Sequence, residues 1–119
     1  MRNAWAISSL SIPIVKKYSF CAEVMSVVAP NIPILIEFFA PWCGPCKAME
    51  PVVAGIKEQL RDGATIFVIN VEEHPILADE FTVLNLPTLI MYRNGKKIKT
   101  LTGIQKKEYL IALLLNSWF

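Results

Sequence analysis

The sequence has 119 residues, a length that suits one domain and would crowd two. Hydrophobic residues make up 54% of the chain and charged residues 18%, which excludes a disordered protein and favours a single apolar core. The 12 basic and 10 acidic residues are dispersed and sum to a net charge of +2, which argues against a nucleic-acid partner, and charges interrupt every apolar stretch before the roughly 20 residues of a membrane-spanning helix.

The first residues allow two interpretations. One Arg precedes an apolar, Ser-containing stretch, as in a short signal peptide, but Pro13 interrupts it and no small-residue cleavage site follows. We therefore expect residues 1–11 to be a leader and residues 12–119 to be the folded domain, with a first strand over about residues 12–16. An export signal is the alternative.

The middle of the chain predicts a strand followed by a long helix. Ser19 can cap a first helix, which carries Cys21 and cannot continue past Pro30. Residues 34–39 are apolar on both alternating faces, as in a central strand covered on both sides. From Cys43 to about Arg61, apolar residues recur at spacings of three and four, which is typical of an amphipathic helix.

The second half predicts three strands and two helices. Residues 65–71 repeat the pattern of a buried strand, and the helix before them predicts parallel pairing with a right-handed crossover. Pro75 can open a short helix, and residues 88–92 and 96–102 flank Asn94-Gly95, the strongest short hairpin signal. Residues 107 to about 116 read as a closing helix.

The motif Cys43-Gly44-Pro45-Cys46 lies at the expected junction of strand and helix. One helical turn separates the two cysteines, so they can form a disulfide. The partial positive charge of a helix N-terminus would stabilise a thiolate at Cys43, which makes it the expected nucleophile. Cys46 lies one turn further in, shielded, and is the expected resolving thiol.

The cysteine pair has a second interpretation as part of a metal site, and the third cysteine, Cys21, has two possible roles. The pair is also half of a zinc or iron–sulfur ligand set, but Cys21 and His74 are the only further soft ligands and have no paired spacing, so we expect no metal. We expect Cys21 to be a buried apolar residue rather than a reactive thiol.

The chain resembles the thioredoxin family. The resemblance is carried by Phe39-Ala40-Pro41-Trp42 and the CGPC motif, by Pro51 and Leu86-Pro87-Thr88, and by Asn94-Gly95 and Gly103. It implies a thioredoxin-like α/β fold with a central five-stranded mixed sheet, four flanking helices and the dithiol at the carboxyl end of the second strand.

The resemblance also implies a substrate groove. The Leu86–Pro87 peptide bond would be cis and would face the dithiol. The groove residues carried over from the family are Trp42, Gly44, Pro45, Leu86, Pro87 and Gly103. Their surface is mainly apolar and suits an extended, strand-like segment of a substrate. Ordinary loop packing is the alternative role for Trp42.

Glu37 is a carboxylate in an otherwise apolar strand, where it must find a polar partner or have its pKa raised by desolvation. The family commonly has an aspartate at the matching position, which assists proton transfer at the second cysteine through water. The resemblance therefore implies a catalytic role for Glu37, although the extra methylene changes the distance, and a tolerated structural carboxylate is the alternative. Val68 departs from a lysine that many members have near this acid.

We expect a reductase of protein disulfides that holds no cofactor. By resemblance, its electrons come from a flavin- and NADPH-dependent thioredoxin reductase, its substrates are disulfide-containing proteins, and it is a cytoplasmic monomer. An exported thiol carrier or disulfide isomerase is one alternative. A non-redox assembly or chaperone module that uses the groove and the apolar last helix is another.

Overall fold

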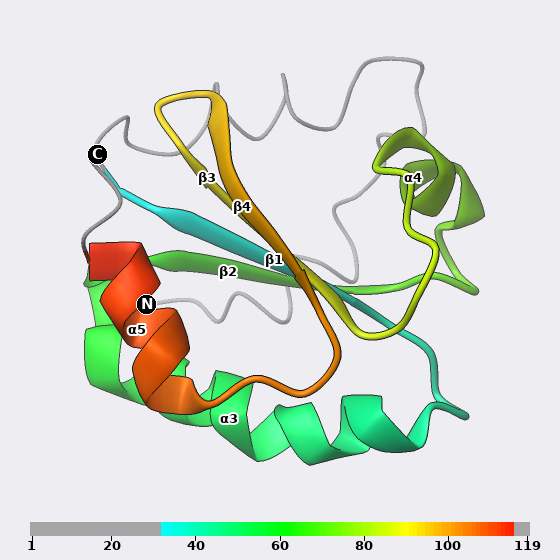
Figure 1. Cartoon of the computed structure of the whole chain (residues 1–119), viewed down its shortest axis with the longest axis horizontal. Coiled ribbons are helices and arrows are strands. Elements are labelled where there is room, and N and C mark those ends of the chain that lie inside the picture. Colours follow the sequence, from blue (N-terminus) through cyan, green and yellow to red (C-terminus); the bar gives the residue numbers. More distant parts are fainter. Residues whose placement is uncertain (1–31, 116–119) are drawn as a thin grey trace.

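The computed structural model of the chain describes residues 32–115 (Figure 1). The expected leader, first strand, first helix and Cys21 lie outside these residues. The proposed domain boundaries at residues 11 and 12 therefore stay predictions.

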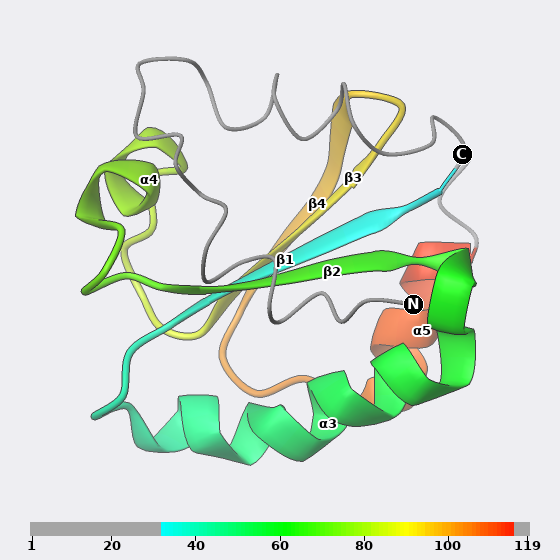
Figure 2. The same ribbon diagram turned by 180° about the vertical axis from the view of Figure 1, so that it is seen from behind.

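The described part is built on a mixed sheet of four strands in the order β2-β1-β3-β4 (Figure 2). The strands are β1 (Ile34–Phe39), β2 (Thr65–Asn70), β3 (Thr88–Arg93) and β4 (Lys96–Thr102). β1 pairs parallel with β2 and antiparallel with β3, and β3 pairs antiparallel with β4. The mixed sheet and its four expected strands are confirmed, whereas the fifth strand was expected outside the described residues.

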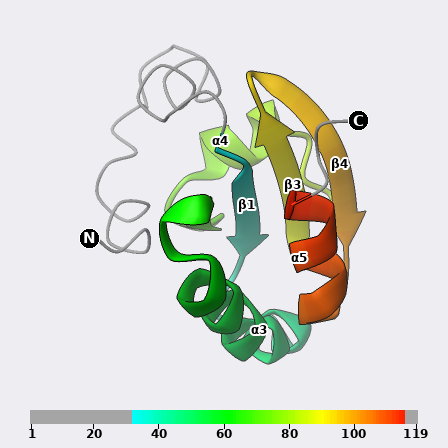
Figure 3. The ribbon, with the colours of Figure 1, turned by 90° about the vertical axis from the view of Figure 1, so that its left-hand side faces the viewer.

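Helices cover both faces of this sheet. They are α3 (Gly44–Leu60), α4 (Pro75–Glu80) and α5 (Lys107–Leu115), with a short 3-10 turn over Arg61–Gly63. α3 and α5 lie next to each other beside the sheet, and α4 lies apart from them (Figure 3). Within residues 32–115, no helix is long and apolar enough to cross a membrane.

β1 separates the core into two layers because its side chains alternate between the faces of the sheet. Ile34, Ile36 and Phe38 belong to the layer shared with Leu77 of α4. Leu35 belongs to the opposite layer, which α3 and α5 cover. That second layer contains Met49, Val53, Ile56, Ile66, Leu89, Met91, Leu110, Ile111 and Leu114. Burial on both faces explains the uninterrupted apolar run that predicted this strand.

Aromatic rings pack against one another in the core layer that α4 covers. The ring centroids of Phe38 and Phe81 are 5.3 Å apart, and those of Phe81 and Tyr92 are 6.3 Å apart in an edge-on arrangement. Such offset and edge-on pairs are favourable because the positive ring edge meets the negative ring face. They join the segment after α4 to β1 and β3, and thereby help to place the loop that precedes β3.

The hairpin between β3 and β4 turns at the expected dipeptide. Asn94 has a φ of 55° and Gly95 a φ of 79°, the pair of positive angles that a type I′ turn needs. An added Cβ at Gly95 would meet no atom within 4 Å. The demand for glycine at this position is therefore conformational and not steric.

We expect Gly95→Ala to lower the free energy of unfolding by about 1 kcal/mol, because a Cβ disfavours the left-handed region. Urea denaturation measures the loss. Gly63→Ala is the matched control, since its surroundings are equally open and its φ is not in that region. Equal stability of the two variants would contradict this account of the turn.

Candidate active site

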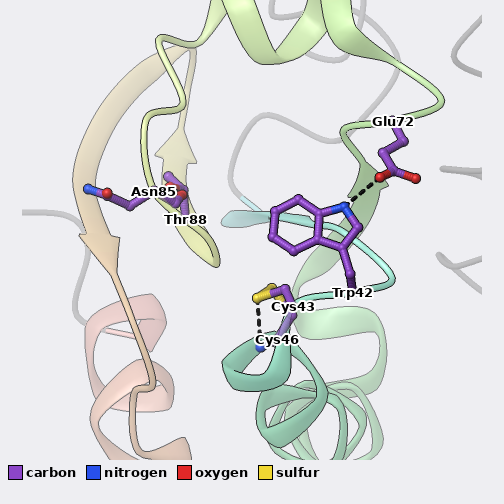
Figure 4. Close-up of a disulfide and its surroundings, with 6 residues drawn as sticks. All are labelled: Trp42, Cys43, Cys46, Glu72, Asn85 and Thr88. Atoms are coloured by element: carbon purple, nitrogen blue, oxygen red, sulfur yellow. Dashed lines mark hydrogen bonds between the residues drawn. A yellow bond between two sulfur atoms is a disulfide. The ribbon is translucent and has the colours of Figure 1, made fainter.

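The two cysteines lie at the junction between β1 and α3. β1 ends at Phe39, and Cys43 caps the helix that begins at Gly44. The backbone N–H of Cys43 donates to the carbonyl of Ala40 at 3.1 Å, which closes the intervening turn. Cys43 and Cys46 form a disulfide with their Cα atoms 5.3 Å apart (Figure 4). The expectation that this pair can close is confirmed.

The helix N-terminus presents positive charge to one of the two sulfurs. The backbone N–H of Cys46 donates to Sγ of Cys43 at 3.1 Å (Figure 4). After reduction, the same donor and the helix dipole would stabilise negative charge on Cys43. Burial does not separate the two thiols, because Cys43 is 5% exposed and Cys46 3%. The two cysteines differ instead in position, because Cys43 is the N-cap of α3 and Cys46 lies in its first turn.

The segment before β3 lies against the dithiol. Leu86 packs on the small cluster formed by Ala40, Cys43 and Cys46. The Leu86–Pro87 peptide bond is cis, the isomer that the family resemblance implies. The carbonyl of Pro87 accepts a hydrogen bond from the backbone N–H of Gly103 at 2.9 Å. Three segments that are distant in the sequence are thus joined beside the disulfide.

Trp42 extends from this junction toward solvent. Its side chain is 70% exposed, which counts against an ordinary packing role, and its indole N–H donates to the carboxylate of Glu72 (Figure 4). The backbone N–H of Glu72 in turn donates to Oδ1 of Asn70 at 2.8 Å. Sequence reasoning missed Glu72. The position of Glu72 just after β2 was a usable signal, since the carboxyl ends of parallel β1 and β2 meet at one edge of the sheet.

Glu37 is 3% exposed and belongs to the central strand. It lines a cavity of about 340 Å³ behind the disulfide. The residues that line this cavity are Glu37, Phe39, Cys46, Glu50, Ala54 and Val68. Burial, and secondly the charge of Glu50, raise the pKa of Glu37 from 4.5 to about 7. Glu37 therefore changes its charge near neutral pH, in a cavity that it shares with Cys46.

Val68 and Glu50 are two further residues that line the cavity. Val68 is the direct partner of Glu37 in the register of β1 and β2, so an apolar side chain stands where many family members have lysine. Sequence reasoning missed Glu50, although its distance of four residues from Cys46 on α3 was a usable signal. Among residues 32–115, no group of three or more His, Cys, Asp or Glu side chains is placed to hold a metal ion.

Comparison with known proteins agrees with this arrangement. Residues 11–116 match the family model Thioredoxin. Thioredoxin of Alicyclobacillus acidocaldarius is 38% identical over 95 residues, which cover 80% of this chain and 90% of that protein. A bifunctional thioredoxin reductase/thioredoxin of Mycobacterium leprae is 38% identical over 93 residues, which cover 78% of this chain and 20% of that protein.

A solved structure extends the match to three dimensions. The structure of a thioredoxin variant from Halobacterium salinarum superposes with a TM-score of 0.70 at 34% identity, and the match covers 81% of this chain and 83% of that one. The sheet, its helices and the closed Cys43–Cys46 pair form a thioredoxin-like α/β fold. The chain belongs to the thioredoxin family of thiol–disulfide oxidoreductases, enzymes that reduce protein disulfides.

Proposed function

We propose that this chain reduces protein disulfides by a two-step exchange in which Cys43 attacks and Cys46 resolves. The observation that carries the proposal is the hydrogen bond from the backbone N–H of Cys46 to Sγ of Cys43 at the start of α3. This donor favours the thiolate at Cys43, and a thiolate is the form that attacks a disulfide.

In the first step, the Cys43 thiolate attacks one sulfur of the substrate disulfide. A mixed disulfide forms, and the other substrate sulfur leaves as a thiolate that takes up a proton. In the second step, Cys46 loses its proton and attacks Sγ of Cys43. The Cys43–Cys46 disulfide forms, the bond to the substrate breaks, and the two electrons of the dithiol end on the two substrate thiols.

The surface around the disulfide favours an extended substrate segment. The proposed groove consists of Trp42, Gly44, Pro45, Leu86, Pro87 and Gly103. Leu86 packs against the cysteine cluster, and Gly44 leaves open space beside it because an added Cβ would meet nothing within 4 Å. Glu72 supports Trp42 in this role by fixing its indole.

Glu37 is the proposed proton acceptor for Cys46 in the second step. The two residues line one cavity, and its volume of about 340 Å³ can hold water molecules that bridge them. The raised pKa of Glu37, about 7, makes its carboxylate a stronger base than an ordinary glutamate.

Regeneration of the dithiol needs an external reductant, and we propose a flavin- and NADPH-dependent thioredoxin reductase. The relative from M. leprae supports this choice, because its name joins a thioredoxin reductase and a thioredoxin in one protein. Coupled turnover of a disulfide-bonded protein with NADPH and such a reductase tests the proposal. No turnover under these conditions would contradict it.

Two alternatives share this fold and differ in measurable ways. An exported thiol carrier or isomerase would use a different electron donor and would lose its N-terminus on export, whereas the reductase is expected to act in the cytoplasm. A non-redox binding module would keep its activity when Cys43 and Cys46 are both replaced by Ser.

Replacing each of the two cysteines by Ser should cause a different defect. We expect Cys43→Ser to abolish reduction, because the attacking thiolate is gone, and Cys46→Ser to accumulate a mixed disulfide through Cys43, because resolution is lost. Mass spectrometry of the protein after exposure to a disulfide-bonded substrate measures the adducts. Adducts that form through Cys46 in the Cys43→Ser variant would reverse the assignment.

Glu37→Gln should slow the second step selectively. The amide keeps the shape of the side chain but cannot accept the proton of Cys46, so the resolving rate should lose its rise with pH near neutrality while attack by Cys43 changes little. Single-turnover kinetics of the two steps provide the measurement. An unchanged resolving rate and pH profile in a folded variant would make Glu37 a structural residue.

Glu37 should also make stability depend on pH. Its folded pKa of about 7 lies above the unfolded value of 4.5, so the folded protein holds a proton that the unfolded chain has already lost. The contribution of this group is complete below the unfolded pKa and is lost as pH rises through the folded one, by about 3 kcal/mol in total.

Urea denaturation of the oxidised protein between about pH 5 and about pH 8 measures this effect. The wild-type protein should lose more stability over that interval than Glu37→Gln, which has no group to titrate. Parallel pH dependence of the two proteins would show that Glu37 ionises normally in the folded state.

A further inference from the structure

One face of α3 runs from the dithiol to solvent-exposed positions of the helix. Cys46, Glu50 and Ala54 are each four residues apart and therefore lie in one row along the helix. All three line the cavity that Glu37 borders from β1. Cys46 is buried and Glu50 is exposed, so Glu50 stands at the mouth of the cavity and Cys46 at its inner end.

Among the described residues that line the cavity with Glu37, Glu50 is the charged one. α3 contributes Glu50 to the cavity, β2 contributes the apolar Val68, and β1 adds Phe39. The partner of Glu37 in β3 is Leu89, which cannot titrate, and α5 contributes no residue to the lining. Lys47 precedes Glu50 by three residues but is not among the lining side chains.

A buried carboxyl group is harder to ionise when a negative charge lies near it. Burial disfavours the charged form of Glu37, and the charge of Glu50 disfavours it further. Among the lining residues no cation offsets this repulsion. The base strength of Glu37 should therefore depend on the charge that position 50 carries.

We propose that Glu50 is a positioning residue for the resolving step, and that its charge at the mouth of the cavity controls the exchange of a proton between Glu37 and Cys46. The inference rests on the proposed function, in which Glu37 accepts that proton. The Cys46 thiol transfers its proton through water to the Glu37 carboxylate, and the Cys46 thiolate then attacks Sγ of Cys43 and releases the substrate thiolate. Glu37 afterwards returns the proton to solvent through the open end of the cavity beside Glu50.

Glu50→Gln tests the inference, and Glu58→Gln is its matched control. Both changes remove one negative charge from an exposed position of α3, but Glu58 does not line the cavity. Two measurements are made on each protein. The first follows the carboxyl-carbon NMR signal of Glu37 against pH in the oxidised protein, with the signal assigned by its loss in Glu37→Gln. The second follows the resolving rate against pH in single turnovers.

In Glu50→Gln, we expect the titration midpoint of Glu37 and the midpoint of the resolving rate to move together to lower pH. The rate at high pH should fall a few-fold, because the Glu37 carboxylate becomes a weaker base. Glu50→Lys should move both midpoints further in the same direction. Glu58→Gln should leave both where they are in the wild-type protein.

The outcomes separate this inference from the proposed function. An unmoved NMR midpoint in Glu50→Gln overturns the inference, even if Glu37→Gln still slows resolution. A moved NMR midpoint with an unmoved kinetic profile also overturns it, because position 50 then affects Glu37 without affecting the reaction. Normal resolution by Glu37→Gln overturns the proposed role of Glu37 and the role of Glu50 with it.

Discussion

The proposed chemistry of this protein depends on the contact between the N-terminus of α3 and Sγ of Cys43. A helix begins with backbone N–H groups that have no partner within the helix, and here one of them, from Cys46, points at the sulfur. The rest of the molecule fixes that contact in place. β1 is buried on both faces and leads into the turn before α3. The first turn of the helix therefore cannot move without disturbing the core.

The same construction creates two different environments next to the disulfide. In one of them, Leu86 and the Pro87–Gly103 contact bring an extended segment beside the cysteines, and Trp42 stands exposed at the edge. The cavity that Glu37 and Cys46 line together contains none of these residues. Substrate recognition and proton transfer can therefore use separate surfaces, although the two sulfurs are one helical turn apart.

Sequence patterns predicted most of the described fold because its signals are local. The run at 34–39, the spacing along α3 and the Asn94-Gly95 turn each depend on residues close together in the chain, and each element formed where it was expected. The shift in the register of β3 and β4 between Met91 and Tyr92 was not predicted, because this register depends on cross-strand packing. Sequence reasoning expected Cys46 to be the shielded cysteine, but the two turned out to be buried almost equally, because the surrounding segments cover both.

The sequence by itself determined the dithiol, its place at a helix start and the burial of an acid in a central strand, since one motif and one apolar run carry all three. Only the tertiary structure decided which groups surround them. The indole of Trp42 meets Glu72 thirty residues away, and Glu37 shares its cavity with Glu50 on another element. Such pairs arise when separate helices and strands pack together, and no local pattern encodes the distance between side chains that meet in this way.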